Sequence, residues 1–199
     1  MTDARPDLSP SIDDGYPIVV RLAGRRVVVV GGGAIAFRKT AGLVAAGATV
    51  TVVSPDLAPA FDPALDPAFD PANVTLVRRR YESGDIEGAW LVVAATNDPA
   101  VQQQVFDDGE RAGVFVNAVD DPQRCSFILP AEERRGPVIV AVSTQGRSPS
   151  LAGQLRDFIA AQLPADLAEI AERVAAQRQQ IRDAGASTED VVWPNPLAT

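Results

Sequence analysis

The feature that most constrains the fold is a run of valines that leads directly into a cluster of glycines. Residues 27–30 are four consecutive valines, and residues 31–33 are three glycines. Valine is β-branched, and an unbroken apolar run of this length is typical of a parallel strand that is covered on both faces. A helical pattern of apolar residues then begins at Ala34. The segment therefore predicts a strand, a tight glycine turn and a helix in direct succession.

This succession carries a dinucleotide-binding fingerprint, with Gly31, Gly33 and Ala36 at its three positions. The first position permits a tight turn, the second leaves space for a pyrophosphate, and Ala36 lets the helix pack closely on the sheet. The N–H groups at a helix N-terminus attract phosphate. A second predicted strand, Thr49 to Val53, closes the strand–helix–strand unit within about thirty residues. This context favours nucleotide binding over a chance turn.

Further strands and helices alternate along the chain. A helix is expected over Ala100 to Ala112, with Asp98 as its N-cap and Gly113 at its end. Additional strands are predicted over several apolar segments, namely Tyr16 to Leu22, Val74 to Val77, Ala89 to Ala95, Val114 to Asn117, Ser126 to Leu129 and Val138 to Val142. This alternation predicts an α/β fold with a doubly wound, Rossmann-like and mostly parallel sheet.

The chain is expected to divide into four regions. Residues 1–15 resemble a disordered N-terminus, and residues 16–149 form the nucleotide-binding domain. Apolar residues at helical spacing from Leu151 to Ile181 predict amphipathic helices over residues 150–184, with a break at Pro164. This stripe needs a partner surface. Residues 185–199 are expected to be a loose tail with Trp193 as a candidate anchor, and the Asp-Pro-Ala repeat between residues 54 and 72 predicts an extended surface loop.

Composition excludes several classes of function. The net charge of −8 argues against nucleic acid as a partner. The chain contains no histidine, which excludes histidine-based metal sites and Ser–His catalysis, and no tightly held metal is expected. Cys125 has no partner for an internal disulfide, and no apolar run is long enough to span a membrane. Without a secretory signal at its polar N-terminus, the chain is expected to be cytoplasmic.

Ligands of open parallel sheets bind beyond the carboxyl ends of the strands. Ser54 and Asp56 follow the second strand, where an acidic residue commonly binds the ribose of NAD, and no arginine is nearby for the phosphate of NADP. NAD is therefore favoured. Because histidine is absent, Asp120 is the best candidate for an acid or base. A solvated turn residue is the simpler interpretation of any loop aspartate, and Asp121 is interpreted in that way.

Several motifs together resemble the N-terminal part of siroheme synthase and its free-standing relatives, the precorrin-2 dehydrogenase/sirohydrochlorin ferrochelatase family. The motifs occur in the family's order: Tyr16-Pro17, VVVVGGGAIAFRK, AAGATVTVVSP, LVVAATND, VNAVDDP, SFILPA and VAVSTQGRSPSLA. The resemblance covers approximately residues 16 to 165. The following helical region resembles, more loosely, the family's dimerisation segment, which implies a homodimer.

The resemblance implies NAD-dependent oxidation of the tetrapyrrole precorrin-2 to sirohydrochlorin, a step toward siroheme. Some members of the family also insert iron. The family's essential aspartate falls on Asp120. The expected cofactor contacts are positions at the strand ends and the glycine turn: Gly31, Gly33, Ala34, Ile35, Ser54, Pro55, Asp56 and Thr96. The expected substrate contacts are loop residues: Asn117, Arg124, Ser143, Thr144 and Arg147.

Two alternatives stay open at this point. A non-catalytic NAD-sensing module would need neither Asp120 nor the loop from Gly146 to Pro149. A different small dehydrogenase would usually bring its own histidine, tyrosine–lysine or metal signature. Ser143-Thr144 stands where the family has two serines, and the Asp-Pro-Ala segment also departs from the family pattern. A substrate with eight carboxylates would moreover need a local patch of arginines on this acidic protein.

Overall fold

The computed structural model describes residues 15–62, 71–189 and 191. The chain divides into two compact units, and the boundary along the sequence lies between Ile128 and Leu129. This boundary precedes the expected one at residues 149 and 150, because the segment just after Leu129 forms a hairpin with its own helices. The expectations for residues 1–14, for most of the Asp-Pro-Ala repeat and for Trp193 lie outside the described residues.

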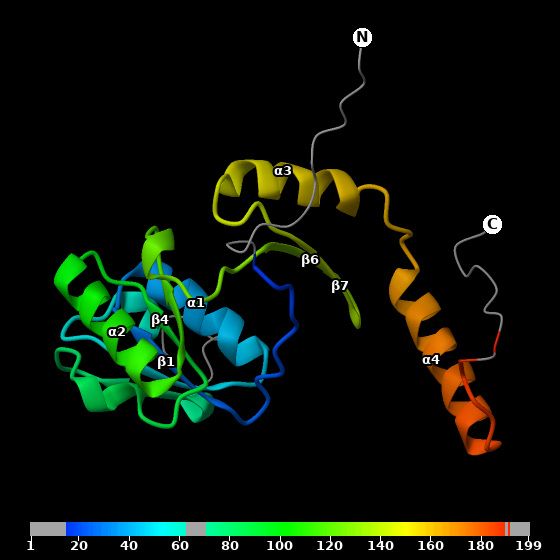
Figure 1. Cartoon of the computed structure of the whole chain (residues 1–199), viewed down its shortest axis with the longest axis horizontal. Helices are drawn as coiled ribbons and strands as arrows, with labels where there is room; N and C mark the ends of the chain where they lie inside the picture. Colours follow the sequence, from blue (N-terminus) through cyan, green and yellow to red (C-terminus); the bar gives the residue numbers. More distant parts are fainter. Residues whose placement is uncertain (1–14, 63–70, 190, 192–199) are drawn as a thin grey trace, which may run out of the picture. The chain divides into compact units, whose positions relative to one another are not determined.

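A five-stranded parallel sheet forms the centre of the first unit (Figure 1). Its strands lie in the order β3-β2-β1-β4-β5, and every neighbouring pair is parallel. The strands are β1 (Arg26–Val30), β2 (Thr49–Val53), β3 (Val74–Val77), β4 (Leu91–Ala94) and β5 (Phe115–Ala118). The predicted α/β fold with a doubly wound, Rossmann-like sheet is confirmed.

The valines of β1 pack alternately on two hydrophobic layers. Val28 and Val30 belong to the layer that contains Val105 of helix α2 (Pro99–Ala112). Val27 and Val29 belong to the layer that contains Ala36 of helix α1 (Ala34–Ala45). All four valines are at most 3% exposed. Burial on both faces explains why this strand is uniformly apolar.

Both ends of α2 are marked by capping residues that the sequence identifies. The Asp98 side chain accepts hydrogen bonds from the main-chain N–H groups of Ala100 and Val101, at 2.9 and 3.4 Å. Gly113 follows the last helical residue in the left-handed conformation, with φ of 67°. Both predicted helix-end residues are therefore confirmed.

Two predicted strands of the first unit are wrong. Residues 16–22 form no strand, and of these residues only Leu22 is buried. Residues 126–129 also form no strand, although the Ser126 main-chain N–H donates to the Val116 carbonyl at 2.8 Å. The expected surface loop after β2 is wrong in part, because Phe61 in the short helix η1 (Pro59–Phe61) is only 2% exposed. Its ring packs edge-on against Phe37 of α1, with centroids 5.3 Å apart.

The second unit combines a hairpin with two helices. Strands β6 (Ala131–Arg135) and β7 (Val138–Val142) pair in antiparallel fashion and do not join the parallel sheet. Helix α3 (Pro149–Ala160) is capped by the Ser148 side chain, and helix α4 (Leu167–Asp183) follows it. The predicted helices and the break at Pro164 are confirmed. In the ranges that the structure describes, none of the helices has both the length and the apolar character of a membrane span.

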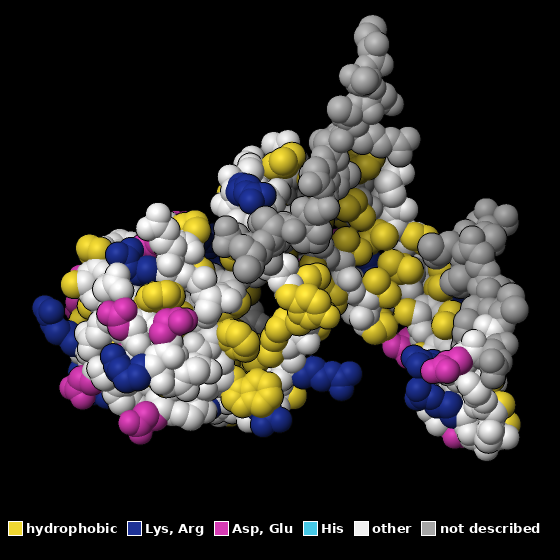
Figure 2. Space-filling view, viewed as in Figure 1, with side chains coloured by type: hydrophobic (Ala, Val, Ile, Leu, Met, Phe, Trp, Pro, Cys, Tyr) yellow, Lys and Arg dark blue, Asp and Glu magenta, His cyan; other side chains and the backbone are white. Residues whose placement is uncertain are grey.

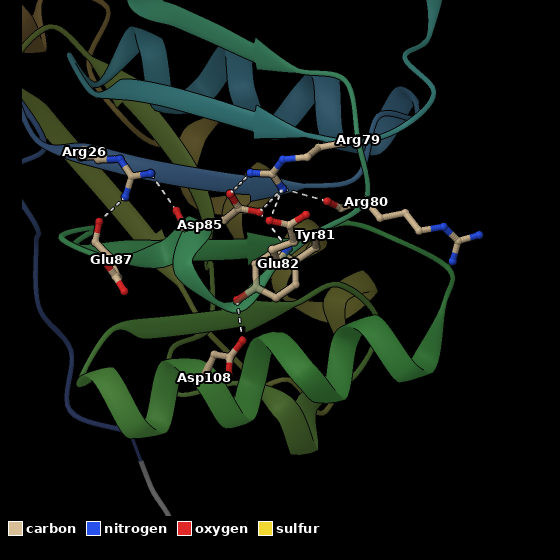
Figure 3. A network of polar contacts seen from close by, with 8 residues as sticks. All are labelled: Arg26, Arg79, Arg80, Tyr81, Glu82, Asp85, Glu87 and Asp108. Carbon is tan, nitrogen blue, oxygen red and sulfur yellow. Dashed lines mark hydrogen bonds and ion pairs between the residues drawn. The ribbon is translucent and has the colours of Figure 1, made fainter.

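A polar network joins the segment after β3 to the sheet, as Figure 3 shows. Arg79 donates to both carboxylate oxygens of Asp85, at 2.8 and 2.6 Å. Arg26 of β1 donates to the main-chain carbonyls of Asp85 and Glu87. Asp85 therefore receives a bidentate arginine contact while most of its side chain is withdrawn from solvent.

A second contact in Figure 3 links the same segment to α2. The buried Tyr81 hydroxyl donates to Asp108 at 2.9 Å, and Asp108 also accepts a 2.7 Å hydrogen bond from Arg111. Burial alone would raise the pKa of Asp108 and of Asp85. Their hydrogen bonds and the neighbouring arginine charges outweigh it, so the pKa of each carboxyl group lies below its ordinary value.

These lowered pKa values predict acid sensitivity. A carboxylate with a lowered pKa stabilises the fold above its unfolded-state pKa, and this contribution is lost as the pH falls through the folded-state pKa. We expect the melting temperature to decrease from about pH 5 toward pH 3. Asp85→Asn should lower the free energy of unfolding by about 1–3 kcal/mol at pH 7. On acidification, the melting temperature of this variant should fall less than that of the wild type. Circular dichroism melts across this pH range test this, and parallel pH profiles of wild type and variant would contradict it.

Candidate active site

The register of the sheet brings four strand ends to one edge. Val53, Val30, Ala94 and Ala118 are successive Cα partners across β2, β1, β4 and β5. The loops that follow these residues therefore lie beside one another. Because α1 and α2 connect strands on opposite sides of the β1–β4 pair and pack in different layers, a crevice is expected between their N-termini.

The first two glycines of the turn are required by the fold. Gly31 has φ of 121°, and a Cβ atom there would lie 2.2 Å from the Ala95 carbonyl oxygen. A Cβ atom on Gly32 would lie 2.0 Å from the Asp56 carbonyl oxygen. The Ser54 hydroxyl donates to that same carbonyl at 2.7 Å. The loop after β2 therefore packs directly on the glycine turn, and the Ser54 hydroxyl holds this loop in place.

Gly33 differs from its two neighbours. It is the N-cap of α1, it has φ of −79°, and a Cβ atom there would meet no atom within 4 Å. No side chain caps the helix, and its first turn contains no acidic residue. Ala34 and Ile35 follow in this turn, and both are exposed. An open helix N-terminus of this kind fits the phosphate group of a dinucleotide.

A depression of about 230 Å³ lies next to this helix end. It brings together three of the predicted site residues, Ile35, Thr96 and Asp120. The other lining residues come from the loops after β4 and β5 and from the start of α2: Ala95, Asn97, Gln102, Val119 and Asp121. The site residues predicted from the sequence did not include them, although their neighbour Thr96 was among the predicted cofactor contacts.

Gln102 fixes the two loops of the depression. Its side-chain Nε2 donates to the main-chain carbonyls of Thr96 and Val119, at 2.8 and 3.3 Å. Asp120 itself is exposed and adopts the left-handed conformation with φ of 61°. Aspartate tolerates this conformation better than most residues. The geometry therefore presents a carboxylate on the rim of the depression.

Several contacts fasten the loop that carries Asp120. Asn117 is buried, and its side-chain Nδ2 donates to the Phe127 carbonyl at 3.0 Å. The Cys125 sulfur lies 3.2 Å from the carbonyl oxygens of Ala118 and of Asp121. Burial raises the pKa of the Cys125 thiol, so this side chain packs as a neutral group. Asn117, which was expected to contact substrate, holds the loop in this structure.

Arg124 is already paired within the protein. Its guanidinium forms an ion pair with Asp121 and donates through Nε to Gln103 at 2.7 Å. Asp121 is therefore an ion-paired residue, and its interpretation as a solvated turn residue is wrong. The remaining predicted substrate contacts, Ser143, Thr144 and Arg147, lie in the second unit between β7 and α3, and their role stays a prediction.

A resident metal has no visible site in this part of the chain. Across the described ranges, no three acidic or cysteine side chains are grouped in a way that could hold a metal ion.

Pro55 and Asp56, both exposed, follow β2 on the edge that also carries the glycine turn. The predicted cofactor contacts thus lie along one edge of the sheet, and their roles stay predictions.

This site has the features of a dinucleotide-binding protein of the Rossmann type: an open glycine turn, a parallel sheet and an adjacent carboxylate. A family model described as putative NAD(P)-binding matches residues 18–131. The chain belongs to this NAD(P)-binding family.

Similarity to individual proteins extends further along the chain. A siroheme synthase of Aeromonas hydrophila is 40% identical over 177 residues, which cover 89% of this chain and 36% of the relative. A siroheme synthase of Photobacterium profundum is 42% identical over 158 residues, 79% of this chain and 33% of the relative. The chain thus spans about a third of the length of these relatives. A solved structure described as SirC, precorrin-2 dehydrogenase, matches with a TM-score of 0.72 and 26% identity, covering 88% of this chain and 84% of that one.

Gly33→Val tests the role of the open helix N-terminus. We expect the affinity for NAD to fall by about tenfold or more, because a branched side chain would occupy the path of the pyrophosphate. The cost in folding stability should stay near 1 kcal/mol, since φ is negative and a Cβ atom at this position meets no neighbour within 4 Å. Calorimetric titration with NAD and a thermal melt without ligand measure the two effects. Unchanged NAD affinity would mean that the turn has only a structural role.

Proposed function

We propose that the chain catalyses the NAD-dependent oxidation of precorrin-2 to sirohydrochlorin, a step of siroheme biosynthesis. The observation that carries this proposal is the convergence of Ile35, Thr96 and Asp120 on one depression beside the open N-terminus of α1. The likeness to siroheme synthases and to a structure described as precorrin-2 dehydrogenase supports the choice of substrate.

The glycine turn supports a binding mode for the cofactor. The main-chain N–H groups at the start of α1 would donate to the pyrophosphate above Gly33. The loop from Ser54 to Asp56 contains no arginine that could pair with a 2′-phosphate, which favours NAD over NADP. The depression is smaller than a typical site for a whole cofactor, so it would hold only the reactive end. When bound, NAD supplies the hydride acceptor for the oxidation.

Asp120 would act as the general base. The oxidation removes one hydride and one proton from precorrin-2, and the Asp120 carboxylate would accept that proton. Its exposure on the rim of the depression lets it contact a ligand. The apolar side chains of Ile35, Ala95 and Val119 line the same depression and would help to keep water from the reacting atoms.

The direct experiment is to mix the protein with precorrin-2 and NAD under anaerobic conditions. We expect the absorption spectrum of sirohydrochlorin to appear together with one equivalent of NADH. A protein that binds NAD but forms no sirohydrochlorin would favour the alternative, a non-catalytic NAD-sensing module, and would refute the proposed activity.

The proposal extends to ferrochelatase activity at the same site. Iron would enter as a substrate and displace two pyrrole protons, which the exposed Asp120 carboxylate would accept one after the other and pass to water. Incubation of sirohydrochlorin with the protein and ferrous iron or cobalt tests this step. Metallation no faster than in the absence of protein would rule it out.

We also propose a homodimer in the cytoplasm. Helix α3 exposes three large apolar side chains, Leu151, Leu155 and Phe158, at 46%, 41% and 67%. Figure 2 shows hydrophobic side chains gathered over the first turns of α4. Pairing of two copies through these helices would cover such surfaces. Light scattering at micromolar concentration distinguishes a dimer from a monomer.

A further inference from the structure

Lys39 is the chain's single lysine, and it lies on α1 one helical turn after Ile35. Residues four positions apart share one face of a helix, and helical side chains lean toward the helix N-terminus. The Lys39 side chain is therefore directed toward the turn of Ile35, which lines the same depression as Asp120. Lys39 is half-buried, whereas the adjacent Arg38 is exposed.

The surroundings of Lys39 disfavour its positive charge, and Asp120 offsets this effect only in part. Burial lowers the pKa of the Lys39 ammonium, the charge of Arg38 acts in the same direction, and Asp120 opposes both. Asp120 is therefore within electrostatic reach of Lys39. Among the described side chains, however, Lys39 forms no ion pair. A partly desolvated cation is stabilised when a ligand supplies an anion at hydrogen-bonding distance.

Arg124, a second cation near this edge, is already paired within the protein. Arg124 pairs with Asp121 and Gln103, so a ligand would have to displace these contacts to reach its guanidinium. The depression otherwise presents two carboxylates, Asp120 and Asp121, to any ligand. Arg124 already balances the charge of Asp121, so a negatively charged ligand would be repelled mainly by Asp120 unless a further positive charge stood close by. Lys39 is placed to supply that charge.

We propose that Lys39 is an anion-binding side chain of this site and that its ammonium contacts an oxyanion of the bound ligand beside Asp120. Two ligands carry such a group, the carboxylates of a tetrapyrrole and the pyrophosphate of a dinucleotide. The tetrapyrrole source rests on the proposed function, whereas the dinucleotide source rests only on the NAD(P)-binding family.

The test compares Lys39→Gln with a matched control, Arg38→Gln, which removes the same charge from the next residue of the helix. Dissociation constants are measured for NAD by calorimetry and for sirohydrochlorin by its absorbance, so that no turnover is needed. We expect Lys39→Gln to weaken one of the two ligands by about tenfold or more, as for the loss of a hydrogen bond to a charged group. Arg38→Gln should change either constant by about twofold at most.

The ligand that is weakened identifies the anion, a phosphate if it is NAD and a carboxylate if it is sirohydrochlorin. Lys39→Arg should retain most of the affinity, since it keeps the charge, and this rescue excludes a purely packing role. If both constants of Lys39→Gln stay within about twofold of wild type, or if Arg38→Gln loses as much, the inference is wrong. Turnover of precorrin-2 by the wild-type protein tests the proposed function separately, because it does not depend on either variant.

Discussion

Asp120→Asn is expected to lower the rate of precorrin-2 oxidation by about 10² to 10⁴, the usual cost of losing a positioned general base. Asparagine has nearly the same size and also tolerates the left-handed conformation that Asp120 adopts, with φ of 61°. The substitution therefore removes the proton acceptor while it preserves the loop. NAD affinity should change little, because the pyrophosphate would bind at Gly33. Steady-state turnover and NAD titration measure the two quantities.

Asp121→Asn serves as the comparison for this variant. The Asp121 carboxylate is held by Arg124, so its substitution should cost mainly stability, with a much smaller effect on the rate. Asp120→Asn with wild-type turnover would remove Asp120 from the mechanism. Loss of NAD binding in both variants would instead show that the loop holds the cofactor, and the role in proton transfer would lose its support.

Gly31→Ala is expected to destabilise the fold by about 3 kcal/mol or more. A Cβ atom at this position would lie 2.2 Å from the Ala95 carbonyl oxygen, and φ is 121°, which L side chains rarely adopt. The clash involves the main chain of the loop after β4, which cannot move aside as a flexible side chain would. For a protein of this size, the melting temperature should fall by roughly 10 °C.

Gly33→Ala is the matched control for Gly31→Ala. Its Cβ atom meets no neighbour within 4 Å, and its φ is −79°. The expected loss is at most about 1 kcal/mol, the difference between glycine and alanine at an N-cap. Thermal melts of the two variants give the contrast directly, and an insoluble Gly31→Ala protein would agree with it. Equal melting temperatures would show that the turn tolerates a side chain at both positions.

The sequence predicted those parts of the fold that local chemistry decides. Four valines followed by glycines specify a buried strand and a tight turn, and both appear where expected. Asp98 and Gly113 mark the ends of α2 because capping depends on residues a few positions apart. The family resemblance rested on motifs of this same local kind, and the comparisons with known proteins confirm it.

Parts that depend on distant contacts were not predictable in this way. The apolar segment from Tyr16 to Leu22 looks like a strand, but apolar composition does not specify a pairing partner. Phe61 lies in a proline-rich segment, a composition typical of a surface loop, yet its side chain is buried against Phe37. Residues 131–135 are mostly charged and nevertheless form β6, because the turn at Gly136 pairs them with an apolar strand.

The candidate site shows the same division. Ile35, Thr96 and Asp120 were predictable from their positions at strand and helix ends, and they share one depression. Gln102 was missed because the carbonyls that it binds belong to two other loops. The pairing of Asp121 with Arg124 had a local signal, an acidic and a basic residue three positions apart, that could have identified it.

The fastened loop around Asp120 has a consequence for the reaction barrier. Asn117 and Cys125 form an isolated bridge, and the side chains of both anchor the short segment between them. The conformational entropy of this segment is therefore lost during folding, before any ligand arrives. A base on a free loop would lose that entropy in each catalytic cycle, which would add to the activation free energy. Preorganisation of this loop would let an exposed aspartate serve as the proposed base without a histidine to orient it.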